Sequence, residues 1–97
     1  MFKIEFTPES LDDMSMLRKH ERRRIFGEIE KQLKHQPEHE TRNRKKLRPN
    51  QIAEWELCVD NFRIFYDIDK DEKTVKIATV GYKIGSKLFI HGEEYEL

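Results

Sequence analysis

Positive charge is concentrated in a short segment near the middle of the sequence. The seven residues from position 42 to 48 include Arg42, Arg44, Lys45, Lys46 and Arg48. Contacts from Lys and Arg to phosphate give nucleic-acid binding much of its affinity and make that affinity depend on salt. This basic segment therefore predicts contact with a polyanion; the alternative explanation of its charge is solubility alone.

A single arginine lies inside the mainly aromatic run that follows. Arg63 is the only cation of Phe62–Tyr66, and a planar guanidinium can hold a phosphate through two hydrogen bonds. If Asp60-Asn61 is a two-residue hairpin turn, Glu56 and Cys58 lie on the same sheet face as Arg63. A carboxylate at Glu56 is then either a general base beside a bound phosphate or one half of a diagonal ion pair with Arg63.

The residue types that bind metals or attack as thiolates are sparse. Cys58 is the only cysteine, so there is no disulfide framework and no cysteine-based zinc site, and no activating base is evident beside its thiol. His35 and His39 have the spacing of one helical turn, but Pro37 lies between them and interrupts a helix. We expect no metal ion and no cofactor.

Periodicity predicts the elements of the first half of the chain. Phe2, Ile4 and Phe6 alternate with charged residues, which predicts a short strand, and Thr7-Pro8 has the pattern of a helix start. Helical spacing then recurs twice and predicts two helices, or one bent helix, in an antiparallel hairpin; its apolar positions are Leu11, Met14, Leu17, Ile25, Phe26, Ile29 and Leu33. Residues 36–50 are predicted to form a basic loop anchored by Leu47.

Alternation predicts a small sheet in the second half. With Asp60-Asn61 as the turn, Val59 pairs with Phe62, Leu57 with Ile64 and Trp55 with Tyr66, all on one face. A second hairpin through residues 69–73 leads to a strand at 74–80, and residues 87–90 form a possible last strand. We expect Trp55 to be buried against the helices, while the opposite sheet face stays free to bind.

Length and composition fit one small globular domain spanning residues 1–97. The chain is 39% charged with a net charge of zero, which argues against indiscriminate coating of nucleic acid. The charges are unevenly distributed along the chain. Residues 1–48 carry 13 basic and 9 acidic side chains, and residues 49–97 carry 6 basic and 10 acidic side chains. No apolar run approaches membrane-spanning length and no signal peptide is evident, so we expect a cytoplasmic protein without membrane contact. The fold class is α+β: a helical hairpin packed on a small, mostly antiparallel, twisted sheet.

Three short motifs in this order resemble the RelE/ParE superfamily of type II toxin–antitoxin toxins over nearly the whole chain. Lys46-Leu47-Arg48 resembles a basic segment before the second strand of RelE-type ribonucleases. Phe62–Tyr66 resembles their aromatic-Arg-aliphatic-x-Tyr strand, and Thr79–Lys83 is similar to a strand that ends in Val-Gly and a basic residue. The resemblance implies a RelE-like fold and a cognate antitoxin protein as partner.

For activity, the resemblance implies a ribosome-associated mRNA endonuclease, in which an RNA 2′-oxygen attacks the adjacent phosphate without a metal. Arg63 matches the family pattern unchanged, and Lys83 stands where the family has an arginine. Family lysines correspond here to Glu56 and Cys58, and a family tyrosine near the C-terminus falls on Phe89. The candidate catalytic residues are therefore Arg63, Lys83, Glu56, Tyr82 and His91, and the candidate RNA-binding residues are Arg42, Arg44, Lys45, Lys46 and Arg48.

The departures from the family pattern leave several interpretations open. Tyr82 is alternatively a half-buried packing residue, and His91 an ordinary surface histidine. The protein is alternatively a catalytically weakened relative, a ParE-like inhibitor that binds DNA gyrase and cleaves nothing, or a non-toxic binding module of the same fold. The partners implied are thus an antitoxin together with ribosome and mRNA, or with gyrase.

Overall fold

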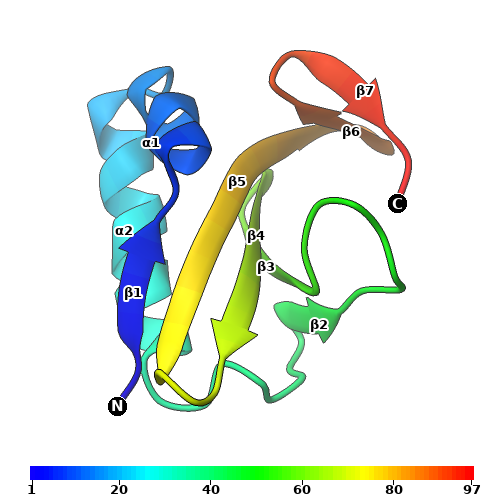
Figure 1. Ribbon diagram of the computed structural model, residues 1–97. Coiled ribbons are helices and arrows are strands. Elements are labelled where there is room, and N and C mark those ends of the chain that lie inside the picture. Colours follow the sequence, from blue (N-terminus) through cyan, green and yellow to red (C-terminus); the bar gives the residue numbers. More distant parts are fainter.

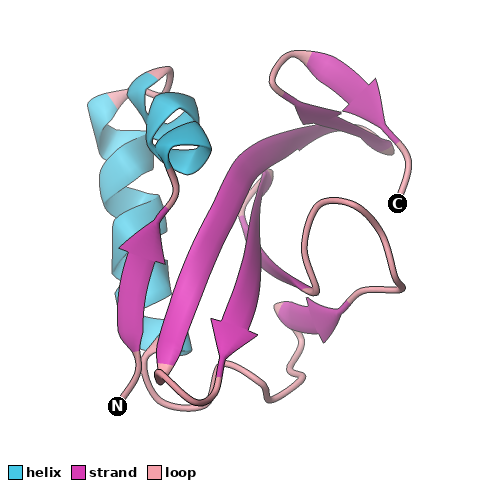
Figure 2. Cartoon of the chain, viewed as in Figure 1, coloured by secondary structure: helices cyan, strands magenta, loops and turns pink.

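The computed structural model describes residues 1–97 and contains two helices and seven strands (Figure 1). The helices follow the first strand and come before the other six (Figure 2). In chain order the elements are β1 (Lys3–Phe6), α1 (Pro8–Ser15), α2 (Lys19–Leu33), β2 (Arg44–Lys46), β3 (Trp55–Val59), β4 (Phe62–Asp69), β5 (Thr74–Ile84), β6 (Lys87–Ile90) and β7 (Glu93–Tyr95).

The seven strands form one sheet in the order β2-β3-β4-β5-β6-β7, and β1 pairs with β5 off this path. Every pairing is antiparallel except β1 with β5, which is parallel. Both helices lie on one side of the sheet, and the β6–β7 hairpin projects from the far end of β5 (Figure 1). The predicted α+β fold, a helical hairpin on a mostly antiparallel sheet, is confirmed.

The register of the β3–β4 hairpin is the predicted one. Trp55 is opposite Tyr66, Leu57 opposite Ile64, and Val59 opposite Phe62, so Cys58 is opposite Arg63 on the other face. Asp60 in the turn adopts a positive φ of 53°, a conformation that Asp tolerates better than most residues. The hairpin therefore sorts apolar and polar side chains onto opposite faces of two adjacent strands.

The helices begin and end where local chemistry requires. Thr7 caps α1 by accepting a hydrogen bond from the Ser10 amide at 3.1 Å, and Pro8 occupies the first turn. A break at Arg18 separates α1 from α2. Met14 is buried, whereas Leu11, of the same apolar stripe, is 51% exposed, because α1 is only two turns long and buries a narrow face.

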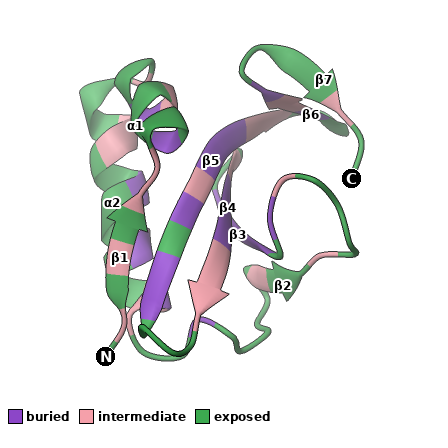
Figure 3. Cartoon of the chain, in the orientation of Figure 1, coloured by how far each residue is buried: buried purple, intermediate pink, exposed green.

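The main core lies between the helices and the sheet (Figure 3). Trp55 is 6% exposed and stacks on Tyr66 with ring centroids 6.1 Å apart, as predicted, in the same buried cluster as Ile25 and Ile29. The Tyr66 hydroxyl donates to the Pro37 carbonyl at 2.8 Å, and burial raises the pKa of this phenol. The pairing satisfies the one polar group that Tyr66 brings into the core.

The sequence predicted that the opposite sheet face is free to bind, but the structure covers part of it. Ala53, Phe65, Leu88 and Ile90 form a second, smaller buried cluster there. Leu47 and Tyr95 pack against it. The β2–β3 loop and the C-terminal strands thus cover part of this face, and only the remainder is open to a ligand.

Three further boundaries differ from the prediction. Residues 36–50 are not all loop, because Arg44–Lys46 form β2 and pair with β3. The strand expected at 74–80 continues to Ile84 as β5, and β7 was not predicted. Gly81 permits this extension, since a Cβ there would approach the Phe89 carbonyl oxygen to 2.6 Å. The glycine allows β6 to pack closely where β5 curves (Figure 1).

No helix is long and apolar enough to span a membrane.

Candidate functional site

A cleft of about 840 Å³ opens on the sheet face away from the helices. One wall is the basic segment of β2 and the loop after it, and the other is formed by the β5–β6 turn and the end of the chain. Its cationic lining residues come from both walls: Lys45, Lys46, Arg48, Lys83 and Lys87. Its acidic lining residues are Glu56, Glu94 and Glu96. Cations separated by some 40 positions in sequence therefore converge on one space.

Glu56 is the buried carboxylate of this cleft. Only 7% of the residue is exposed, and Lys45 of β2 is its partner in the strand register. Its Oε2 lies 3.8 Å from the Cys58 Sγ. Burial, followed by the Glu56 charge, raises the pKa of the Cys58 thiol, so this cysteine is poorly suited to act as a nucleophile. The structure contains no ion pair between Glu56 and Arg63, which leaves the carboxylate available.

Arg63 lies on the same face but does not line the cleft itself. Its Nη1 donates to the carbonyls of Asp60 at 3.0 Å and Phe62 at 2.9 Å. Neither Nη2 nor Nε makes a hydrogen bond within the protein, so the three N–H groups on these two nitrogens remain free. The hairpin end thus fixes one nitrogen of the guanidinium and leaves the others available to an acceptor such as phosphate.

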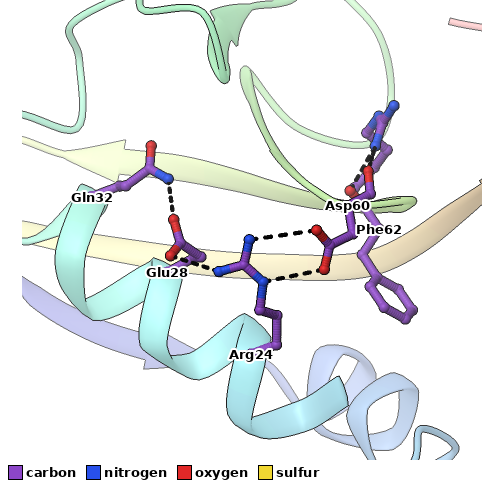
Figure 4. A network of polar contacts seen from close by, with 6 residues as sticks. Arg24, Glu28, Gln32, Asp60 and Phe62 are labelled. Atoms are coloured by element: carbon purple, nitrogen blue, oxygen red, sulfur yellow. Dashed lines mark hydrogen bonds and ion pairs between the residues drawn. The ribbon is translucent and has the colours of Figure 1, made fainter. Parts of the chain in front are cut away.

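The turn that holds Arg63 is tied to α2 (Figure 4). Arg24 Nε and Nη2 donate to the Asp60 carboxylate at 3.2 and 3.4 Å, and Arg24 Nη1 contacts Glu28 at 3.0 Å. The hydrogen bond to Asp60 is the main reason that the pKa of Arg24 is raised. Since the Arg24 and Asp60 side chains are solvent-exposed, this pair orients the turn more than it stabilises the fold.

Tyr82 and His91 line a different cavity, of about 440 Å³, between α1 and the sheet. His91 Nδ1 lies 2.8 Å from Asp13 Oδ1, and Tyr82 stacks on Phe89 with ring centroids 5.5 Å apart. The structure therefore does not bring these two candidates together with Glu56 and Lys83. The half-buried packing role weighed for Tyr82 is the one observed.

The cations of the basic segment do not all face the cleft. Lys45, Lys46 and Arg48 line the cleft. Arg44 is opposite Leu57 and points the other way, where its Nη1 donates to the carbonyls of Gln32 at 2.6 Å and Gln36 at 2.9 Å. Arg44 thus satisfies carbonyls at the end of α2, a structural task that leaves it poorly placed for RNA. Arg42 is exposed and outside the cleft.

Sequence reasoning missed Lys87, Glu94 and Glu96 as cleft residues. They depend on the β6–β7 hairpin, whose turn residues His91 and Gly92 have φ values of 55° and 78°. Two left-handed residues are the signature of a tight hairpin turn. The alternation of Leu88 and Ile90 on one side of His-Gly was the available signal, but His is a less obvious turn residue than Asn or Asp.

As a whole, the cleft suits a ligand with several negative charges. Five cations line it together with the buried carboxylate of Glu56 and the carboxylates of Glu94 and Glu96, and a sixth cation, Arg63, lies on the same sheet face with two free nitrogens. A phosphodiester strand could be held by the cations while the carboxylate accepts a proton from a bound hydroxyl.

Comparison with known proteins gives one family. The family model described as ParE toxin of type II toxin–antitoxin system, parDE, matches residues 4–83. A search of curated proteins found no match.

Several solved structures share the fold. The isolated E. coli RelE toxin superposes with a TM-score of 0.72 at 17% identity, covering 89% of this chain and 88% of that one. The RelBE2 toxin–antitoxin complex from Mycobacterium tuberculosis gives a TM-score of 0.66 at 22% identity, covering 84% and 98%. The archaeal RelE–RelB complex from Pyrococcus horikoshii gives a TM-score of 0.62 at 15% identity, covering 88% of this chain and 97% of that one. At such identities the likeness concerns the fold.

Proposed function

The chain belongs to the ParE toxin family of type II toxin–antitoxin systems, and on that premise we propose that it is a toxin that binds and cleaves mRNA at the ribosome. The cleft between the basic segment and the C-terminal strands is the proposed RNA site. The proposal rests above all on one observation: the cleft that holds the buried carboxylate of Glu56 is also lined by Lys45, Lys46, Arg48, Lys83 and Lys87.

In the proposed reaction, an RNA 2′-oxygen attacks the adjacent phosphorus and the 5′-oxygen of the next nucleotide leaves. Glu56 accepts the 2′-hydroxyl proton. Arg63 and Lys83 hold the phosphoryl oxygens as charge builds up on them. Tyr82 and His91, proposed from the sequence as proton donors, line the other cavity. We therefore assign the proton for the leaving oxygen to a cleft ammonium group, with Lys45 the nearest to Glu56 by register.

The partner in this proposal is an antitoxin that masks the toxin. Solved neighbours include the RelBE2 and RelE–RelB complexes, each of a toxin with its antitoxin. For this chain, an antitoxin that covers the cleft would block RNA directly. The gene beside the one encoding this chain is the place to look for it.

A second candidate function is inhibition of DNA gyrase without cleavage, as in ParE-like toxins. Two observations favour it: the matching family model is that of ParE, and the five catalytic candidates do not converge in one place. In this case the basic cleft would bind a protein or DNA surface, and Glu56 would have no chemical role.

Purified protein incubated in parallel with programmed ribosomes and with gyrase plus supercoiled DNA separates the two functions. The RNA proposal expects mRNA cut within the ribosome, in the presence of EDTA at a concentration that leaves ribosomes intact, and unaffected supercoiling. Inhibited supercoiling with intact mRNA would establish the gyrase alternative. If neither target is affected by protein that is folded, the chain is a binding module.

A further inference from the structure

The C-terminal hairpin brings carboxylates into the cationic cleft. β7 pairs only with β6, at the edge of the sheet, and the segment after it runs back toward the loop between β2 and β3 (Figure 1). As a result Glu94 and Glu96 line the same cleft as the five cations. Glu94 Oε1 lies 4.0 Å from Lys87 Nζ, which is a loose ion pair. Two of the three cleft carboxylates thus come from this one short segment.

The hairpin is held in place by packing and by a polar clamp. Leu88 and Ile90 of β6 belong to the second buried cluster, and Tyr95 of β7 packs against it. At the turn, His91 Nδ1 contacts Asp13 at 2.8 Å, and Asp13 Oδ2 also accepts from the Val80 amide at 2.9 Å. Glu94 is therefore delivered to the cleft by a folded element, and Glu96 follows directly after the end of β7.

We propose that this acidic hairpin is an internal competitor for the RNA backbone. The inference rests on the proposed RNA-binding function of the cleft and concerns its regulation. In the free protein, Glu94 and Glu96 partly neutralise the cations, so an incoming strand must displace them or accept their repulsion. A partner or ribosomal surface that moved β7 aside would raise the affinity of the cleft for phosphate without any change in its cations.

The expected size follows from Coulomb's law and counterion release. A carboxylate about 4 Å from a phosphate charge weakens binding by about fivefold in water, and less in salt. A lysine released from its carboxylate is free to contact a phosphate. Each cation that contacts single-stranded nucleic acid adds about 0.7 to the magnitude of the slope of log K against log salt. Removal of both charges should therefore tighten binding and also steepen its salt dependence.

The test compares Glu94→Gln/Glu96→Gln with wild type and with Glu93→Gln. Glu93 lies on the same strand but does not line the cleft, so it controls for the removal of a carboxylate from the hairpin outside the cleft. The probe is a fluorescent single-stranded RNA of about 12 nucleotides, titrated by anisotropy at several salt concentrations, with thermal unfolding as the check of fold. We expect five- to tenfold tighter binding and a steeper slope for the double variant, and wild-type behaviour for Glu93→Gln.

The other outcomes are distinguishable. Salt-dependent binding that is unchanged, or weakened, in the double variant would overturn the competitor role and leave the RNA-binding cleft standing. Equal tightening by Glu93→Gln would also overturn it, since net charge alone would then explain the effect. No RNA binding by any variant, even at low salt, would reject the proposed function and the inference together.

Discussion

The two faces of the central sheet are built by the same strands and do opposite things. On the helix side, Trp55, Leu57 and Ile64 join a cluster of 12 buried residues. On the other side, Glu56 and Cys58 alternate with them along β3, and the buried cluster has only 4 members. Because side chains alternate between the two faces, successive residues of one strand either stabilise the core or line the cleft.

The smaller cluster fixes the wall of the cleft. Ala53, Phe65, Leu88 and Ile90 form a buried cluster on part of the second face, and the cleft opens beside it. They attach the β6–β7 hairpin, which carries Lys87 to the site. The second face is therefore polar where the cleft lies and apolar where its wall must be fixed.

The largest effect is expected from the helix-side core. Trp55→Ala should lower the free energy of unfolding by about 3–5 kcal/mol, because it removes a large side chain stacked on Tyr66 and leaves a cavity. Ile90→Ala in the smaller cluster should cost about 2 kcal/mol, since a smaller side chain is removed from a cluster with only 4 buried members. Urea unfolding of both variants measures the contrast. Equal costs would mean that the two clusters are energetically one core.

The next effect is on activity. Arg63→Ala should reduce growth arrest and RNA cleavage about a hundredfold, because one preorganised charge contact to the phosphate is lost, while the melting temperature stays near that of wild type. Arg23→Ala, an exposed arginine of α2, is the matched control and should remain toxic. The assay is induction in cells that lack the antitoxin. Full arrest by Arg63→Ala would show that Arg63 serves the hairpin only and that the protein acts by binding.

A third effect concerns Gly81, where β5 curves and β6 packs closely against it. Gly81→Ala should destabilise by about 1–3 kcal/mol, because the new Cβ would lie 2.6 Å from the Phe89 carbonyl oxygen and force β6 away from β5. Gly27→Ala is the control, since a Cβ at Gly27 of α2 meets nothing within 4 Å. That change should stabilise by up to about 1 kcal/mol through helix propensity. Both are measured by thermal unfolding, and a neutral Gly81→Ala would mean that β6 can shift freely.

The sequence predicted the fold well where alternation and turn chemistry agree. The Trp55–Tyr66 and Cys58–Arg63 pairings followed from one turn, Asp60-Asn61, because a two-residue hairpin leaves a single register. The start of α1 followed from Thr7 and Pro8 for the same kind of reason. Such features depend on residues close together in the chain.

The candidate site was predicted less well, because it depends on contacts distant in sequence. Arg44 and Lys45 are neighbours in the basic segment, yet β2 turns one toward α2 and the other toward the cleft. Three-residue strands carry too little periodicity to reveal this. Tyr82 and Lys83 are likewise adjacent on β5 but line opposite cavities. The pairing of β5 with its neighbouring strands shows that Lys83, and not Tyr82, faces the cleft with Glu56.

The most direct test of the RNA cleft is the salt dependence of binding in a variant that loses three of its cations. Lys45→Gln/Lys46→Gln/Arg48→Gln should bind single-stranded RNA about tenfold more weakly than wild type. Since each contact contributes about 0.7, the slope of log K against log salt should fall by about 2. Lys19→Gln/Arg23→Gln/Lys31→Gln, three exposed cations of α2, provides the matched control and should keep the wild-type slope. An unchanged slope in the cleft variant, or an equal loss in the control, would contradict the assignment of this cleft as the RNA site.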